Sequence, residues 1–477
     1  MRYIITSFLC TLLLLLYSCS STNPNKEMID LLQAKDNYEN NPENSFYPEA
    51  VLRYNDSMLT ASTAGDVMKF KYAKATALLQ LGQEQKAVAV FEEMLNETPV
   101  SQTGQRIFLM KDLAMAYLRL GERTNCFHNH SVESCIFPIS TAGVHQDKTG
   151  SQKAIEVYKQ LLTEYPDDLE SKWLLNIAYM TIGGYPPQVP PAMLLKITQE
   201  DTLYRVKPFI DVAANIGLNI NDQAGGSIVD DFNNDGYDDI ITSSWSLKEP
   251  MHYCRNNGNG TFTDVSDSSW LGYLTGGLNI MQTDYNNDGL KDIFVLRGAW
   301  KETFGKEPNS LLRNNGDGTF TDVTHSSGLL SIYPTQTATW ADFNNDGWLD
   351  VFIGNESMPM SEERNTSELY INNKNGTFTE QAAKADCNIR DFVKGVTSGD
   401  YDNDGKTDIF ISTMSGKKYL FKNETVKGGS VKFKEVTWLA GLSKDYTRSF
   451  PAWFFDYNND GWLDILVCSY EFSQPLA

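Results

Sequence analysis

The sequence predicts a multidomain chain in which a domain of helical repeats comes before an incomplete β-propeller. Three observations predict this fold class. An acidic nine-residue phrase occurs five times between residues 231 and 464, at intervals of 53 to 58 residues. Apolar and aromatic residues follow each copy directly, as expected for buried strands. Between about residue 25 and residue 183, small and aromatic residues recur with helical spacing instead.

Residues 1–18 have the pattern of an export signal and are left out of the fold prediction. A short positively charged start is followed by an apolar run to Leu16 and then by Ser18 and Cys19. This ending is similar to a bacterial lipobox and predicts that Cys19 becomes the lipidated first residue of the mature chain. The alternatives are an ordinary signal peptide or a membrane anchor, although the apolar run is short for a span. Lipidation predicts a secreted chain anchored in a bacterial cell envelope, at the outer membrane, with residues 19–44 as a tether.

Residues 45–190 are predicted to form helical repeats similar to tetratricopeptide repeats. Small residues let paired helices approach closely, and aromatic rings fill the groove between them. The residues that carry this pattern are Ala75, Leu78, Gly82, Ala87, Phe91 and Pro99 in the first repeat, Leu113, Ala114, Tyr117, Gly121, Ala154, Tyr158 and Pro166 in the second, and Leu175, Tyr179 and Gly183 in the third. Such repeats predict a groove for a partner rather than catalysis.

The second repeat is interrupted by an insertion at residues 122–152. Gly121 and Ala154 are 33 residues apart, whereas the corresponding pair in the first repeat is 5 apart, which leaves 28 extra residues. The insertion contains Cys126, His128, His130, Cys135 and His145. Two interpretations stay open: a Cys126–Cys135 disulfide in an oxidising compartment, and a soft-metal site for copper or zinc. The Cys-x-x-Cys-His pattern of haem attachment is absent from the sequence, which excludes a c-type cytochrome.

Residues 191–207 are predicted to link the domains, because the preceding prolines cannot continue a helix. Residues 208–477 are predicted to form the blades. The stretch 208–218 is similar to 320–329 and is interpreted as a blade fragment before the first full repeat. The fifth unit has no hairpin phrase after Asp464. The sequence therefore predicts an arc with open strand edges rather than a closed ring.

The five acidic phrases share the pattern Asp-x-Asn/Asp-x-Asp-Gly-x-x-Asp. Oxygen-bearing side chains at alternate positions are typical of a loop around a hard cation, and the glycine permits a backbone with positive φ. Position seven varies freely, as expected for a residue that offers only its backbone carbonyl. The candidate ligands are Asp231, Asn233, Asp235, Tyr237 and Asp239; Asp284, Asn286, Asp288, Leu290 and Asp292; Asp342, Asn344, Asp346, Trp348 and Asp350; Asp400, Asp402, Asp404, Lys406 and Asp408; and Asp456, Asn458, Asp460, Trp462 and Asp464.

Calcium is the cation that these loops predict, with about five ions per chain. Clustered carboxylates repel one another without a cation, and flexible all-oxygen sites suit calcium better than magnesium or zinc. An EF-hand is excluded because position twelve is never glutamate; it is Thr242, Val295, Ile353, Ile411 or Val467. The alternative is a set of acidic turns without metal, and the regular repetition favours the calcium interpretation.

A second phrase recurs between the acidic loops and predicts hairpins. The stretches 255–265, 313–323 and, more weakly, 371–380 contain Asn-Gly or Asp-Gly between apolar runs. One loop, its strand and one hairpin make a propeller blade. These residues resemble the FG-GAP/VCBS repeats of propellers of the integrin-α type, which carry such calcium loops. The resemblance implies a fold but not a function, because propellers also serve as lectins, lyases and scaffolds.

The order of the parts resembles bacterial proteins of the cartilage-acidic-protein family. The resemblance rests on the lipoprotein signal, the helical repeats with their Cys/His insertion and the acidic blades. Members of that family normally continue into a C-terminal ASPIC/UnbV domain. Because this sequence stops at Ala477, the resemblance implies that the C-terminal part is missing.

The leading functional hypothesis is a calcium-stabilised, non-catalytic binding or scaffold lipoprotein with a protein or glycan partner. It would touch the membrane only through its lipid, and the formal charge of −21 argues against nucleic acid. Two alternatives stay open: a carbohydrate-active protein, either a lectin or a calcium-assisted polysaccharide lyase, and a metal or redox protein centred on the insertion. No nucleophile with a neighbouring base is recognisable in the sequence, so no catalytic residue is predicted.

Overall fold

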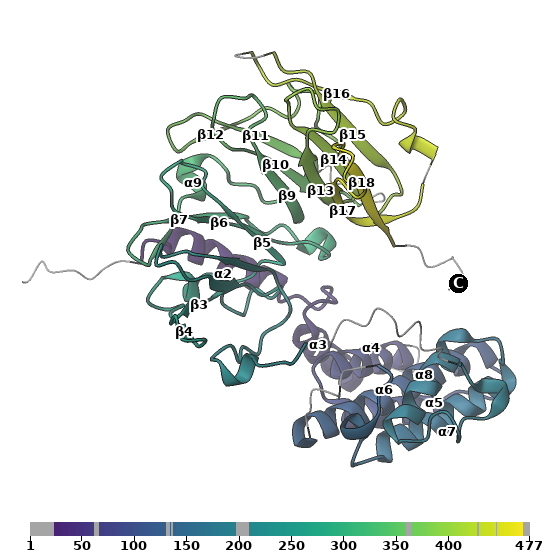
Figure 1. Cartoon of the computed structure of the whole chain (residues 1–477). Helices are drawn as coiled ribbons and strands as arrows, with labels where there is room; N and C mark the ends of the chain where they lie inside the picture. Colours follow the sequence, from purple (N-terminus) through teal and green to yellow (C-terminus); the bar gives the residue numbers. More distant parts are fainter. Residues whose placement is uncertain are drawn as a thin grey trace, which may run out of the picture. The chain divides into compact units, whose positions relative to one another are not determined.

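The computed structural model describes residues 23–61, 66–129, 134, 137–196, 209–358, 365–426, 429–444 and 446–470. The chain divides into two compact units (Figure 1). The helical unit is Glu39–Val212, and the blade unit combines Met1–Tyr38 with Ala213–Ala477. Among the described residues, no helix has both the length and the apolar character needed to cross a bilayer.

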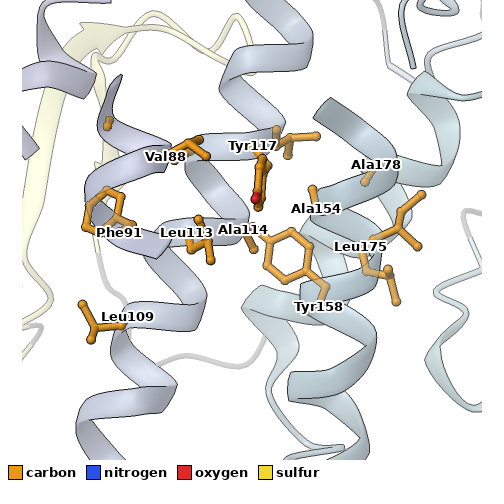
Figure 2. Packing of buried hydrophobic residues seen from close by; sticks show 14 of the residues in the cluster. Val88, Phe91, Leu109, Leu113, Ala114, Tyr117, Ala154, Tyr158, Leu175 and Ala178 are labelled. Atoms are coloured by element: carbon orange, nitrogen blue, oxygen red, sulfur yellow. The ribbon is translucent and has the colours of Figure 1, made fainter. Parts of the chain in front are cut away.

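The helical unit consists of consecutive helices that pack against their neighbours in sequence. They are α3 (Pro48–Ala61), α4 (Val67–Gln80), α5 (Glu84–Glu97), α6 (Thr103–Asn129), α7 (Thr149–Glu164) and α8 (Leu169–Thr181), with short 3₁₀ turns at Thr141–Gly143 and Pro191–Met193. The predicted small and aromatic residues form the core, and Figure 2 shows the Tyr158 ring of α7 pointing toward Ala114 of α6. The prediction of tetratricopeptide-like helical repeats is confirmed.

The insertion leaves the pairing of α6 with α7 intact. Helix α6 continues past Gly121 to Asn129 before the chain leaves it. A Cβ atom on Gly150 would lie 2.6 Å from the Gly121 nitrogen and 2.7 Å from the Tyr117 carbonyl oxygen. The Asn125 side chain ties the insertion back to α6, because it donates to the carbonyls of Gly121 and Asp147, both at 2.8 Å. The backbones of α6 and α7 therefore pack closely together despite the insertion between them.

Part of the segment that the sequence assigned to a tether is a helix, α2 (Lys26–Glu39). Met28 and Leu32 are buried in an apolar cluster with residues of the first two blades. The Asn25 side chain accepts a hydrogen bond from the Asp322 N–H at 2.7 Å and donates to the Phe320 carbonyl at 3.3 Å. Residues 25–38 thus belong to the blade unit, and the four-residue spacing of Met28 and Leu32 is the signal that the sequence offered.

The blade unit is a series of antiparallel sheets in which neighbouring strands are consecutive in sequence. Blade 1 is β1 (Ser227–Asp230), β2 (Asp239–Thr242), β3 (His252–Asn256) and β4 (Phe262–Asp264); blade 2 is β5 (Asn279–Thr283), β6 (Asp292–Leu296), β7 (Ser310–Asn314) and β8 (Phe320–Asp322); blade 3 is β9 (Thr335–Ala341), β10 (Asp350–Asn355), β11 (Glu368–Asn372) and β12 (Phe378–Glu380); blade 4 is β13 (Val393–Gly399), β14 (Asp408–Thr413), β15 (Lys418–Asn423) and β16 (Phe433–Glu435). A fifth sheet consists of β17 (Ser449–Phe455) and β18 (Asp464–Ser469). Short helical turns lie at Ala213–Asn215, Leu271–Tyr273, Glu302–Phe304, Thr324–Ser327 (α9) and Leu442–Lys444.

Burial of the second strand distinguishes blades 2 to 4 from the fifth sheet, and in blade 1 two of the four residues of β2 are buried. Every residue of β6, β10 and β14 is buried, because apolar side chains on both faces pack against neighbouring blades. In β18, by contrast, Leu466 is 47% exposed. Ile210, in the stretch that the sequence offered as a blade fragment, is 77% exposed. Within the described residues the sheets form no closed ring, so the prediction of an incomplete propeller is confirmed.

The stretch before blade 1 is connected to it as one blade is connected to the next. The Phe262 N–H of β4 donates to the Ile216 carbonyl at 2.8 Å. The Phe320 N–H of β8 donates in the same way to the Ser269 carbonyl at 3.0 Å. The described part of residues 208–218 therefore contacts blade 1 as the segment that contains Ser269 contacts blade 2.

Candidate cation-binding loops

The five acidic phrases form five loops with the same backbone conformation. Loop 1 (231–239), loop 2 (284–292), loop 3 (342–350), loop 4 (400–408) and loop 5 (456–464) each join the first strand of a blade to its second strand. The fourth residue is always an asparagine with φ between 54° and 59°, and the sixth is a glycine with φ between 80° and 89°. A Cβ atom on any of these glycines would meet nothing within 4 Å. The glycine is therefore required by its backbone conformation rather than by space.

Backbone N–H groups fix the carboxylates in every loop. In loop 1, Asp231 accepts from the Asp235 N–H at 3.0 Å and from the Gly236 N–H at 2.8 Å. Asp235 in turn accepts from the Tyr237 N–H at 3.0 Å. The corresponding distances in loops 2 to 5 lie between 2.7 and 3.1 Å. Main-chain N–H groups thus hold the carboxylates at positions one and five in the same way in all five loops.

The ninth aspartate is the first residue of the second strand and is fully buried in loops 1 to 4. In loop 2, Asp292 accepts a hydrogen bond from the Asn314 N–H at 2.8 Å. Burial raises the pKa of Asp292 to about 7, and the hydrogen bond from the Asn314 N–H offsets this only in part. Burial likewise raises the pKa of Asp350 to about 7 and that of Asp408 to about 6. These carboxylates have lost water without gaining an equivalent positive partner.

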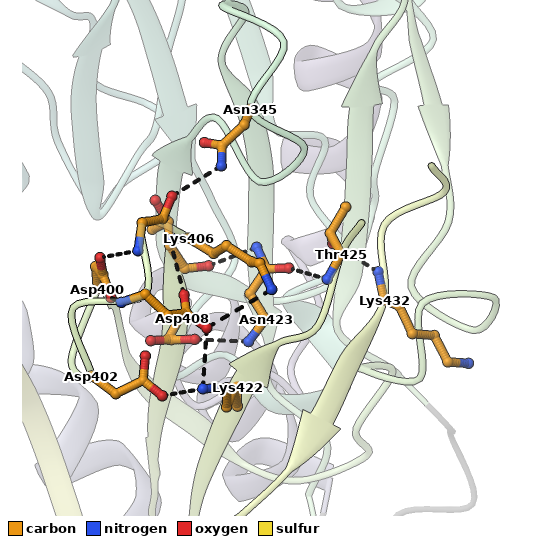
Figure 3. Close-up of polar contacts among 12 residues, drawn as sticks. Asn345, Asp400, Asp402, Lys406, Asp408, Lys422, Asn423, Thr425 and Lys432 are labelled. Atoms are coloured by element: carbon orange, nitrogen blue, oxygen red, sulfur yellow. Dashed lines mark hydrogen bonds and ion pairs between the residues drawn. The ribbon is translucent and has the colours of Figure 1, made fainter. Parts of the chain in front are cut away.

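Several ligand oxygens of the loops are buried without a hydrogen bond among the described residues. They are Asp292 Oδ2, Asn344 Oδ1 and Asp402 Oδ1. In loop 4, carboxylate oxygens of Asp400, Asp402 and Asp408 lie within 4.8 Å of one another (Figure 3). Buried oxygen acceptors that lack a donor are the groups that a cation would satisfy.

Lysines provide part of the positive charge at two loops. The Lys422 ammonium group pairs with Asp402 and, at 3.1 Å, with Asp404 of loop 4 (Figure 3). Lys374 lies 3.2 Å from Asp346 of loop 3. These pairs hold the acidic side chains together in the absence of any other cation.

The position-seven residues and Asp464 lie in the loops as predicted from the sequence. The side chains at position seven are exposed or half-buried, which agrees with their variable identity; they are Tyr237, Leu290, Trp348, Lys406 and Trp462. In loop 5, Asp464 is only half-buried, because β18 lacks the covering that β6 or β14 receives.

Sequence reasoning missed a set of asparagines that connect the loops of neighbouring blades. The Asn314 side chain of β7 donates to the Phe232 carbonyl of loop 1 at 2.8 Å. Asn372 of β11 contacts the Tyr285 carbonyl of loop 2 at 2.8 Å, and Asn423 of β15 contacts the Phe343 carbonyl of loop 3 at 2.9 Å. For Asn314 and Asn372, the available signal was the first asparagine of the recurring Asn-Asn phrase, which resembles simple turn chemistry in the sequence.

The Cys/His insertion is described only in part. Cys126 and His128 lie in the last turns of α6, whereas His130 and Cys135 lie outside the described residues. The His145 ring contacts the Ser151 hydroxyl at 3.2 Å, and its backbone N–H donates to the Thr181 carbonyl at 2.8 Å. Burial lowers the pKa of His145. The disulfide and the soft-metal site both stay predictions, and Cys19 also lies outside the described residues.

A family model of the FG-GAP-like repeat matches residues 231–295, 284–353, 358–411 and 400–467. Cartilage acidic protein 1 from Xenopus tropicalis is 26% identical over 221 residues, which cover 45% of this chain and 32% of that protein. The human protein of the same name is 26% identical over 220 residues, and the Mus musculus protein is 26% identical over 260 residues. The chain thus spans about a third of the length of these relatives.

Among solved structures, the chain is similar to one described as the crystal structure of BBS1N in complex with ARL6DN, soaked with lead. That match has 6% sequence identity and a TM-score of 0.20, and it covers 52% of this chain and 90% of the other. The repeat match and the three relatives agree with the blades and their loops: four FG-GAP-like repeats lie between residues 231 and 467, and this part of the chain is similar to cartilage acidic protein 1.

Proposed function

We propose that this chain is a calcium-stabilised, non-catalytic binding or scaffold protein in which each of the five loops holds one calcium ion. The observation that carries the proposal is the buried, underbonded set of loop oxygens, which includes Asp292 Oδ2 and Asp402 Oδ1. Leaving such acceptors without a partner is unfavourable by about 1–3 kcal/mol each. A cation at each loop would remove this penalty in the folded state.

The donor set fits calcium by its chemistry. Side-chain oxygens come from positions one, three, five and nine, and the loops contain no sulfur or imidazole ligand. A hard cation with a flexible coordination shell prefers such oxygen ligands. When bound, calcium would supply the positive charge that lets buried aspartates such as Asp292 and Asp350 stay ionised. Its role would be structural, since it would join the two ends of each loop.

The lysine beside loop 4 also supports calcium binding, because its ion pairs are weak enough for a divalent cation to replace. Lys422 pairs with two carboxylates of loop 4, and its side chain is 29% exposed. Ion pairs that stay in contact with solvent contribute only about 0.2–1 kcal/mol. A divalent ion held by several oxygens would therefore compete well with the lysine for Asp402.

The binding role is supported by a groove in the helical unit. A cavity of about 470 Å³ lies between α5, α6 and α7 and is lined in part by Glu92, Tyr117 and Lys153. Helical repeats commonly bind partners in such grooves. We propose a protein or glycan as the partner of the chain, with attachment to a bacterial cell envelope through lipidated Cys19. Mass spectrometry of the mature N-terminal peptide would detect or refute that lipid.

The calcium proposal is tested by thermal unfolding with calcium, with magnesium and with a chelator. A ligand bound only by the folded state, at 100 times its Kd, stabilises by about 2.7 kcal/mol. We expect calcium to raise the transition of the blade unit clearly and magnesium to raise it less. Asp346→Ala should reduce the calcium effect, whereas Asp167→Ala, at an exposed position of the helical unit, should not. A transition that chelation leaves unmoved would refute the proposal.

A further inference from the structure

The fourth residue of each loop lies in the left-handed region, where asparagine and glycine are the residues best tolerated. In three loops its side chain also reaches the next loop. Asn287 donates to the Gly347 carbonyl of loop 3 at 2.9 Å, Asn345 to the Gly405 carbonyl of loop 4 at 2.9 Å, and Asn403 to the Gly461 carbonyl of loop 5 at 3.0 Å. We call each of these contacts an inter-loop bond. Figure 3 shows Asn345 reaching toward loop 4.

Each inter-loop bond ends on the peptide unit that holds a candidate cation ligand. The Gly347 carbonyl and the Trp348 N–H belong to one planar peptide unit. That N–H donates to the Asp346 carboxylate at 3.0 Å. In loop 4 the Lys406 N–H donates to Asp404 at 3.1 Å. In loop 5 the Trp462 N–H donates to Asp460 at 2.9 Å.

From this geometry we propose that the fourth-position asparagines are positioning residues for the cation site of the following loop. The asparagine fixes the peptide unit between positions six and seven, and this unit fixes the carboxylate at position five. A hydrogen bond to the carbonyl also polarises the N–H of the same peptide and strengthens its bond to the carboxylate. The inference rests on the proposed calcium function, and it adds that loops 3, 4 and 5 each depend on the loop before them.

Loop 1 provides a control within the same chain. Asn234 has the same φ, 56°, as its counterparts. In the part of the chain that the structure describes, its side chain makes no inter-loop bond. Substituting Asn234 therefore tests the left-handed conformation alone, whereas substituting Asn287 tests that conformation together with the contact to loop 3.

The experiment uses terbium as a calcium substitute, with luminescence excited through tryptophan. In the Trp462→Phe protein, Trp348 is the tryptophan left at position seven, and the part of the signal that a further Trp348→Phe substitution removes reports loop 3. Asn287→Gly keeps a residue suited to positive φ and removes the amide. Because the lost bond is solvent-exposed, we expect terbium affinity at loop 3 to fall about two- to fivefold. Asn234→Gly should leave this affinity unchanged.

A substitution that adds a negative charge distinguishes a positioning role of Asn287 from a purely electrostatic effect on cation binding. Asn287→Asp adds a negative charge close to loop 3, which would tighten cation binding if charge alone mattered. It also replaces an N–H donor by an oxygen that faces the Gly347 carbonyl, so the inferred role predicts weaker binding. Asn234→Asp serves as the matched control. Tighter binding by Asn287→Asp, or equal effects of substitutions at 234 and 287, would overturn the inference.

Amide hydrogen exchange of the cation-free protein gives a second readout. Asn287→Gly should speed exchange at residues 346–349, and Asn234→Gly should leave these residues unchanged. Unchanged exchange in both variants would count against the inter-loop bond. If the parent protein binds neither terbium nor calcium, the calcium proposal itself fails; if it binds them but ignores the substitution at 287, only the inference about positioning fails.

Discussion

The ninth aspartate of a loop has to meet two opposing requirements. Asp292 must be buried because it begins β6, every residue of which is covered by neighbouring blades. It must also carry an oxygen that a cation can reach. The structure meets the first requirement fully and leaves Asp292 Oδ2 without a hydrogen bond in the described residues. The residue is therefore a source of instability in the protein when no cation is bound.

Asp292→Asn should stabilise the cation-free protein and weaken its stabilisation by calcium. The amide keeps an oxygen for the Asn314 N–H but carries no charge, so we expect the cation-free protein to gain about 1–2 kcal/mol of unfolding free energy. The stabilisation by calcium should fall at the same time. Asp464→Asn, at the half-buried equivalent in loop 5, should change the cation-free stability less. Denaturant unfolding with and without calcium measures both effects, and a destabilised cation-free Asp292→Asn protein would contradict this account.

For single residues, the sequence predicted which side chains belong to the loops but not which distant groups they contact. The spacing of acidic residues was sufficient to identify all five loops, because the ligands of one loop are neighbours in the chain. The role of Asn314 could not be predicted, since its acceptor, the Phe232 carbonyl, is 82 residues away. An asparagine two residues before a glycine, as Asn314 is before Gly316, is explained equally well by a turn.

At the scale of the elements, the packing of α6 against α7 requires that their backbones come close together at Gly150. Gly150 is the second residue of α7 and faces the Gly121 nitrogen and the Tyr117 carbonyl. Backbone atoms cannot rotate away as side chains can. The helices must therefore separate if a side chain is introduced at this position.

Gly150→Ala should destabilise the helical unit by about 1–3 kcal/mol, the usual range for overpacking. Gly104 is the matched control, because it is the second residue of α6 and a Cβ atom there would meet nothing within 4 Å. Gly104→Ala should be neutral or slightly stabilising, since alanine favours a helix more than glycine does. Urea unfolding followed by circular dichroism compares the two variants. Equal stabilities would show that the helices can separate freely.

The sequence predicted the repeats but not where every helix ends. The position of Ala154 and Tyr158 identified the displaced second helix correctly, because small and aromatic residues must recur wherever two helices pack. It did not indicate that α6 continues to Asn129, since polar residues after Gly121 suit both an exposed helix and a loop. Helix α2 was missed for a similar reason: its apolar residues are few, and the surface that buries them is formed by distant strands.

At the scale of the whole blade unit, contacts between blades occur at both ends of the strands. The acidic loops lie at one end. Toward the other end of the strands, the buried Lys394 ammonium group of β13 pairs with Glu356 and lies 3.1 Å from the centre of the Trp300 ring. The Trp300 N–H donates to Glu356 at 2.9 Å. This cluster joins three blades, and its residues are too far apart in the chain for the sequence to predict it.

The central claim is that the five loops bind calcium and thereby stabilise the blade unit. Amide hydrogen exchange of the intact chain, with and without calcium, tests it most directly because every loop is observed separately. We expect slower exchange with calcium in loops 1 to 5 and in the first residues of the strands that follow them, with no change in α3 to α8. Unchanged exchange in the loops, or protection confined to the helical unit, would contradict the claim.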